Sequence, residues 1–172
     1  MKIQPQTTDD MKDLGELLDE QRVAMLTLCG TSGTLSSRPM TPLELDSSGA
    51  IWMFTSRKAL AHGFEAGSRR VNLAFSDPSD STYISIEGEA HLLNDSARKH
   101  ELWTSMARPW FPGGEDDPDL VLLKVVLSRA EIWNSPDSSV VRSLAIAASI
   151  AAAKPVGMGD HKVINPPASG AS

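Results

Sequence analysis

The clearest pattern in the chain is a two-residue alternation over residues 82–93, where polar or aromatic positions alternate with apolar ones. This period is typical of a β-strand with one buried face. Shorter apolar runs bounded by turn-forming residues favour further strands over residues 22–29, 34–45, 50–55, 70–76 and 122–133. The turn Gly30–Gly33 lies between the first two of these runs and predicts a hairpin.

Four segments lose this alternation and favour helices. They are residues 8–20, a short stretch within 56–68, residues 96–106 and residues 137–153. In the first, Thr8 is a suitable N-cap, and Asp9 and Asp10 suit the positive end of a helix dipole. Asn94 or Asp95 can cap the third in the same way.

Short strands joined by turns, with helices between and around them, predict a mainly β, α+β fold built on an antiparallel barrel. We find no strand–helix–strand repeat that would support a doubly wound sheet. The 172 residues suit one domain, which we expect over residues 1–153. Residues 154–172 are rich in proline and glycine, and we expect a tail that wraps the domain or extends from it.

Composition and charge exclude several classes of protein. Hydrophobic residues make up 41% of the chain, which argues against general disorder. The longest apolar runs fall far short of the roughly 20 residues that a membrane span needs, so we expect no membrane span. The formal net charge of −6 lacks the basic excess of a general nucleic-acid binder. Short basic pairs such as Arg57-Lys58 could still form a local pocket for one anion.

The reactive side chains predict neither a metal site nor a hydrolase. Cys29 is the single cysteine, which agrees with a reducing compartment, and its apolar strand favours an inert core thiol. The four histidines form no paired ligand motif, and there is no Gly-x-Ser-x-Gly turn or Walker spacing. Acids and amides fill the first 20 residues, where a secretion signal would be basic and then apolar, so we expect a cytoplasmic protein.

One pair of segments could line a ligand pocket. Arg38-Pro39-Met40 lies on the second predicted strand, and residues 52–58 run off its presumed antiparallel neighbour. Arg38 offers a planar fork that suits a phosphate, and Pro39 lacks an N–H and so marks a strand edge or bulge. On composition alone, a solvated arginine on a barrel strand is the alternative interpretation.

Five short motifs occur in order across roughly residues 8–150. They are Arg38-Pro-Met, Trp52-Met-Phe-Thr55, Tyr83-Ile-Ser-Ile-Glu-Gly88, Trp110-Phe-Pro-Gly-Gly with the acidic loop up to Leu120, and Ala130-Glu-Ile-Trp133-Asn-Ser-Pro136. In this order and spacing the chain resembles the general stress protein branch of the pyridoxamine 5′-phosphate oxidase-like, flavin-binding split-barrel family. The tail motif Gly157-Met-Gly-Asp-His161 is also similar to the end of this branch.

The resemblance implies a six-stranded antiparallel, Greek-key split barrel and a homodimer with FMN at the subunit interface. It implies that Arg38 meets the FMN phosphate and that the backbone of Pro39, Met40 and Thr41 faces the ring system. The remaining residues that it assigns to the cofactor are Phe54, Thr55, Tyr83 and Trp133, the last reaching flavin across the dimer. Phe54 in a hydrophobic core and Trp133 closing the barrel are the alternatives.

Two positions depart from the family pattern. Ala61 stands where the family usually has a phosphate-binding lysine, and Arg57 and Lys58 are candidates to replace it. A charge-assisted phosphate contact contributes about 1.5–3 kcal/mol, so its loss predicts weaker FMN binding or tolerance of FAD and riboflavin. Ser143 stands where the oxidases carry a second arginine, so we do not expect a true pyridoxamine 5′-phosphate oxidase.

Three functions follow from the resemblance as hypotheses. The first is a flavin-dependent oxidoreductase, in which the cofactor carries the redox chemistry and the protein positions it. The second is a flavin-binding stress protein without turnover, suggested by Ala61 and Ser143. The third is a haem-binding split barrel, with histidine ligands to be drawn from His62, His91, His100 and His161.

Overall fold

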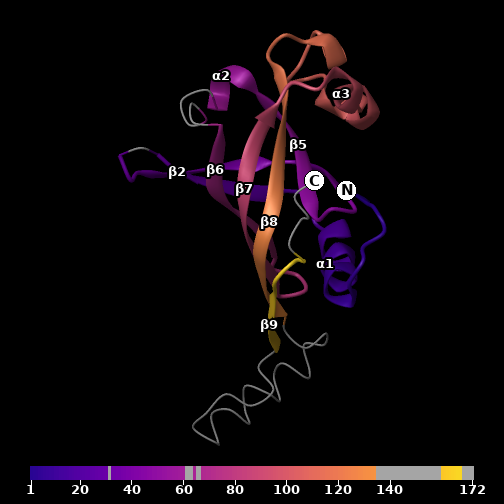
Figure 1. The fold of residues 1–172 in the computed structure, drawn as a ribbon, viewed down its shortest axis with the longest axis vertical. Helices are drawn as coiled ribbons and strands as arrows, with labels where there is room; N and C mark the ends of the chain where they lie inside the picture. Colours follow the sequence, from indigo (N-terminus) through magenta and orange to yellow (C-terminus); the bar gives the residue numbers. More distant parts are fainter. Residues whose placement is uncertain (31, 61–63, 65–66, 135–159, 168–172) are drawn as a thin grey trace, which may run out of the picture.

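The computed structural model describes residues 1–30, 32–60, 64, 67–134 and 160–167, and these form one mixed β-sheet with few helices (Figure 1). The described strands are β1 (Lys2–Ile3), β2 (Ala24–Cys29), β3 (Leu35–Met40), β4 (Pro42–Leu45), β5 (Ala50–Ser56), β6 (Ser68–Asp77), β7 (Thr82–Leu93), β8 (Leu120–Asn134) and β9 (Asp160–Ile164). The described helices are α1 (Asp9–Asp19), α2 (Arg57–Leu60) and α3 (Ser96–Leu102), with 3₁₀ turns η2 (Ser105–Ala107) and η3 (Gly114–Asp116).

The sheet has the order β1-β4-β5-β8-β7-β6-β2-β3, and β9 pairs with β8. β1 runs parallel to β4, and the other described pairs are antiparallel. Figure 1 shows α2 and α3 toward one end of the long strands β7 and β8, and β9 toward the other. The sheet therefore has two distinct ends, and the candidate site residues divide between them.

The predicted count of six strands, all antiparallel, was wrong. The strand expected over residues 34–45 is divided at Thr41, because β3 pairs with β2 while β4 pairs with β5. Pro39 and Pro42 flank this break, and each lacks an N–H for a ladder. β1 and β9 were not expected. β3 and β4 are consecutive along the chain but lie near opposite ends of the sheet order. Among the described strands, no pair joins those two ends, so closure of the sheet into a barrel stays a prediction.

Several local predictions were confirmed, and one helix is shorter than expected. β7 begins and ends at the predicted residues, and the Thr8 side chain accepts a hydrogen bond from Met11 N, as an N-cap should. The helix predicted over 96–106 ends at Leu102, because Trp103 adopts an extended conformation and packs its ring against Phe54. The helix predicted over 137–153 lies outside the described residues.

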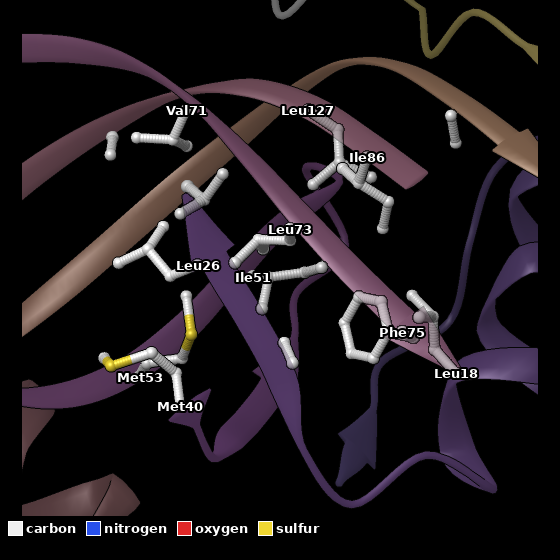
Figure 2. Close-up of a cluster of buried hydrophobic side chains, with 14 of the residues drawn as sticks. Leu18, Leu26, Met40, Ile51, Met53, Val71, Leu73, Phe75, Ile86 and Leu127 are labelled. Carbon is white, nitrogen blue, oxygen red and sulfur yellow. The ribbon is translucent and has the colours of Figure 1, made fainter. Parts of the chain in front are cut away.

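The main core lies on the inner face of the sheet. Leu26, Leu73 and Ile86 occupy neighbouring register positions on β2, β6 and β7, and all three are fully buried. Figure 2 shows them gathered with Met40, Met53 and Phe75, and Leu18 of α1 reaches the same cluster. Burial of each such side chain contributes about 1.5–3 kcal/mol, so this cluster is the main force that holds the strands and α1 together.

A second, smaller cluster lies on the opposite face of β5. Successive strand residues point to opposite faces, so Ile51 and Met53 enter the main core while Trp52 joins Leu102 and Leu122. The same rule corrects the expectation for Cys29, which is exposed because β2 turns Leu26 and Leu28 inward. In the described part of the chain, no helix is long and apolar enough to cross a membrane.

Candidate flavin site

Arg38 is the predicted phosphate-binding residue, and its side chain reaches from β3 to α2. On β3 it lies beside Leu26 of β2, and its Nη1 donates a hydrogen bond of 3.0 Å to the carbonyl oxygen of Ala59. Among the described residues, Ala59 is the only hydrogen-bond partner of this guanidinium group. Four of its five N–H donors thus have no described partner, while one fixes the group beside α2.

Asp119, the residue before β8, fixes the start of α2. Its carboxylate accepts hydrogen bonds from Ser56 Oγ at 2.6 Å and from the Lys58 amide at 3.0 Å. Its carbonyl oxygen accepts a hydrogen bond of 2.7 Å from the Arg57 amide. The hydrogen bonds from Ser56 and Lys58 hold the pKa of the Asp119 carboxyl below its usual value. Asp119 therefore stays ionised near neutral pH and positions the segment that carries Arg57 and Lys58.

This arrangement gathers cationic groups at the end of β3 and β5. The Arg57 and Lys58 side chains are exposed on α2, the same element that Arg38 contacts. Together the three carry three positive charges against one on Asp119. An arginine fork with additional cations nearby is a chemical fit for a phosphate, which accepts charge-assisted hydrogen bonds.

The strand break beside Arg38 exposes backbone. Pro39 is exposed, Met40 is buried in the main core, and Thr41 is exposed between β3 and β4. In the ladders that the structure describes, Thr41 has no partner. Its N–H and carbonyl groups are thus candidates to meet a ligand beside Arg38.

Phe54 and Thr55 face opposite sides of β5. Thr55 is only 6% exposed and points to the same side as Met53. The Phe54 ring lies 5.8 Å from that of Trp103 and 6.4 Å from that of Phe111, centroid to centroid. Phe54 is thus half-buried in the second cluster, as the core alternative expects.

Tyr83 and Trp133 form a separate group, adjacent in register on β7 and β8 and exposed by 44% and 41%. Trp133 lies thirteen residues beyond Leu120, where β8 starts beside α2. At about 3.3 Å per residue this is roughly 40 Å along the strand. The Arg38 side chain is on the face of Leu26, whereas Tyr83 and Trp133 are on the opposite, outer face. The structure thus brings Arg38 together with Arg57 and Lys58 but not with Tyr83 and Trp133.

The face that carries Tyr83 and Trp133 also carries other exposed apolar side chains. These are Met25, Leu35 and Val163, on β2, β3 and β9. An open pocket of about 350 Å³ lies on this outer face, and its lining includes Asn72, Ser85, Arg70 and Arg129. Within the described residues, no group of three metal-ligating side chains occurs.

Sequence reasoning missed two residues of this geometry. Asp119 lies 63 residues from Ser56 in the chain, so no local pattern links them. His161 was noted within a tail motif and as a candidate haem ligand, but its stacking on Trp133 was not expected. In both cases the contact depends on strand pairing that spacing does not reveal.

Comparison with known proteins decides the family. The model of the family described as "Pyridoxamine 5'-phosphate oxidase like" matches residues 9–156, which is most of the chain. The chain belongs to the pyridoxamine 5′-phosphate oxidase-like family. This confirms the family resemblance that the sequence motifs suggested.

Solved structures and a curated relative place the similarity in the general stress protein 26 branch. A Jannaschia sp. CCS1 protein described as general stress protein 26 is 28% identical, with a TM-score of 0.72 covering 92% of this chain and 99% of that one. The "general stress FMN/FAD binding protein" of Xanthomonas citri is 34% identical, with a TM-score of 0.64 covering 76% and 93%. General stress protein 26 of Bacillus subtilis (strain 168) is 30% identical over 59 residues, 34% of this chain and 41% of that protein's length.

Proposed function

We propose that this family member binds a flavin, with FMN as the expected cofactor and FAD or riboflavin as alternatives. The observation that carries the proposal is the hydrogen bond from Arg38 to Ala59, which holds the guanidinium beside Arg57 and Lys58. The Xanthomonas citri relative, described as binding FMN or FAD, supports the same cofactor class.

In this proposal Arg38, Arg57 and Lys58 hold the phosphate, and the backbone from Pro39 to Thr41 faces the ring system. The bound flavin supplies the redox chemistry, and the protein orients it. Arg57 and Lys58 take the place of the family lysine that is Ala61 here. Asp119 contributes indirectly, because it fixes the backbone of α2 through its hydrogen bonds.

We propose further that the molecule is a homodimer with the flavin between subunits, built on a closed split barrel. Arg38 lies on the same face of the sheet as Leu26, whereas Trp133 lies on the opposite, outer face and four strands away. We therefore assign the Trp133 that meets a flavin held by Arg38 to a second copy of the chain. The outer face, with Met25, Tyr83, Trp133 and Val163 exposed, is the surface we assign to that contact.

The test is a titration of purified protein with FMN, FAD and riboflavin, followed by flavin fluorescence. We expect FMN to bind more tightly than riboflavin, because riboflavin lacks the phosphate. Arg38→Ala should weaken FMN binding about 10- to 100-fold, which corresponds to a charge-assisted contact of about 1.5–3 kcal/mol. The melting temperature of the flavin-free protein should change little.

Lys12→Ala is the matched control, since it removes one positive charge from α1 and should leave FMN affinity unchanged. Equal affinities for FMN and riboflavin, together with an unaffected Arg38→Ala variant, would remove Arg38 from the site. Absence of binding by all three flavins would refute the proposed function.

Whether the bound flavin turns over is a separate question. We propose a flavin-dependent oxidoreductase of unassigned substrate. The alternative, flavin binding without turnover, is favoured by Ala61 and Ser143 in place of family phosphate-binding residues. Steady-state oxidation of NAD(P)H separates the two, because consumption well beyond one equivalent per flavin requires turnover.

A further inference from the structure

The C-terminal strand β9 is attached to the sheet by two anchors on one side. It pairs antiparallel with residues 130–134 of β8, and Ile164 is 1% exposed in the main core. Lys162 forms ion pairs of 2.8 Å with both Asp10 and Asp13 of α1. Hydrogen bonds with these two carboxylates raise the pKa of Lys162 to about 12. The backbone of β9 is therefore held at a defined height along β8.

The other side of β9 carries His161 onto Trp133. Their ring centroids lie 5.1 Å apart, and the two planes are inclined by only 14°. His161 Nε2 also lies 3.3 Å from Glu131 Oε2, while the other carboxylate oxygen of Glu131 lies 2.7 Å from Arg129 Nη2. Both the position and the rotation of the imidazole are thus determined.

Trp133 has few other constraints. Its side chain is 41% exposed, and among the described residues its indole N–H donates to no protein atom. Its register neighbour on β7 is Tyr83, but among the described residues the ring that stacks on Trp133 is that of His161. We therefore take the imidazole as the contact that orients the indole. A half-exposed tryptophan without such a partner would exchange between rotamers. Fixing it in one rotamer would then cost conformational entropy and weaken ligand binding.

We propose that His161 is a positioning residue for Trp133: β9 places the imidazole on the indole and so holds Trp133 in the orientation that meets the flavin. This inference rests on the proposed function, since it assigns a role within the same site. It also assigns a role to β9, because this strand would then contribute to the flavin site.

The first test examines the flavin-free protein. Selective ¹⁵N labelling of tryptophan gives indole N–H resonances for Trp52, Trp103, Trp110 and Trp133, and Trp133→Phe identifies the last. His161→Ala should shift or broaden the Trp133 resonance and leave the other three in place. His161→Phe should keep the resonance sharp, because a phenyl ring can also stack. His100→Ala, which removes another exposed imidazole paired with a carboxylate, is the matched control and should leave the Trp133 resonance unchanged.

The second test measures FMN affinity. We expect His161→Ala to weaken FMN binding about 3- to 10-fold, while His161→Phe and the control His100→Ala stay within twofold of the wild type. Trp133→Phe should weaken binding at least as much as His161→Ala. If His161 acts only through Trp133, the double variant binds no more weakly than Trp133→Phe alone.

The outcomes separate the two proposals. Trp133→Phe with unchanged FMN affinity, or a wild type that binds no FMN, overturns the proposed site and this inference with it. Weaker binding by Trp133→Phe, with His161→Ala unchanged in both affinity and spectrum, overturns only the positioning role. Equal losses in His161→Ala and His100→Ala would also overturn it, since the loss of an exposed imidazole away from Trp133 would then have the same effect.

Discussion

Glu44 shows how this fold accommodates a buried charge. The Glu44 side chain is 0% exposed on β4. Its oxygens are paired with Lys2 Nζ at 3.1 Å, with Gln4 Nε2 at 2.7 Å and with the guanidinium of Arg98. Arg98 also lies 4.7 Å from the ring centroid of Trp52. A single carboxylate thus connects the N-terminal strand, β4 and α3.

Removal of Arg98 should be costly because it leaves Glu44 buried with too few partners. Breaking such a pair typically costs about 3–5 kcal/mol, so we expect Arg98→Ala to lower the free energy of unfolding by about 3 kcal/mol. Glu101→Ala is the control, because Glu101 is the exposed partner of the same guanidinium and should cost less than about 1 kcal/mol. Urea unfolding measures both, and equal losses would contradict the role assigned to Glu44.

The pKa of Asp46 indicates how the stability of the protein should depend on pH. Burial raises the pKa of its carboxyl, but hydrogen bonds from Ser48 Oγ, Trp52 Nε1 and the amides of Ala50 and Ser48 outweigh burial and lower it below 3.8. Because the pKa of Asp46 is lower in the folded state than in the unfolded state, its carboxylate stabilises the fold at pH values above the unfolded-state pKa. That contribution is lost as pH falls through the folded-state pKa.

Asp46→Asn removes this titration. We expect the variant to be less stable than the wild type at neutral pH and the difference to narrow as pH falls below about 4. Urea midpoints measured from neutral pH down to about pH 3 test this. A difference that stays constant over that range would mean that the Asp46 carboxylate does not carry the effect.

At the scale of elements, local patterns predicted the structure where one local rule decides it. β7 has a strict alternation and was predicted to the residue, and Thr8 was recognised as the cap of α1 because capping is a property of adjacent residues. β9 could not be predicted in the same way. Its anchors are Ile164 in the core and Lys162 on α1, both supplied by distant parts of the chain.

In the candidate site, too, local patterns were predicted and contacts between distant parts of the chain were not. A turn between two apolar runs predicted the hairpin of β2 and β3, and the lost alternation within residues 56–68 predicted a short helix where α2 lies. Arg38 was a candidate from its planar fork, and the family motifs then favoured its phosphate-binding role. The contacts of Asp119 with Ser56 and of His161 with Trp133 were not predicted, because each depends on pairing across the sheet. Cys29 was misplaced for a related reason: an apolar run does not say which face each residue takes until the register is known.

At the scale of the whole molecule, the outer face of the sheet is where the proposals meet. Met25 lies on this face between Ala74 of β6 and Pro39 of β3 in register, and it is 41% exposed. Tyr83, Trp133 and Val163 extend the same exposed apolar surface across β7, β8 and β9. A second copy covering this face would both hide that surface and bring its Trp133 toward the Arg38 end of the first.

The proposed dimer makes a joint prediction about mass and cofactor. We expect the wild type to sediment at twice the 18.5 kDa of one chain. Met25→Glu should shift it toward the monomer, because an unpaired charge buried in an interface is costly. FMN binding should weaken in the same variant, since the monomer lacks the partner's tryptophan.

Met106→Glu is the matched control, because Met106 is 81% exposed in η2, away from this face. A wild type that stays monomeric at all concentrations, or a Met25→Glu monomer that retains full FMN affinity, would place the whole flavin site within one chain.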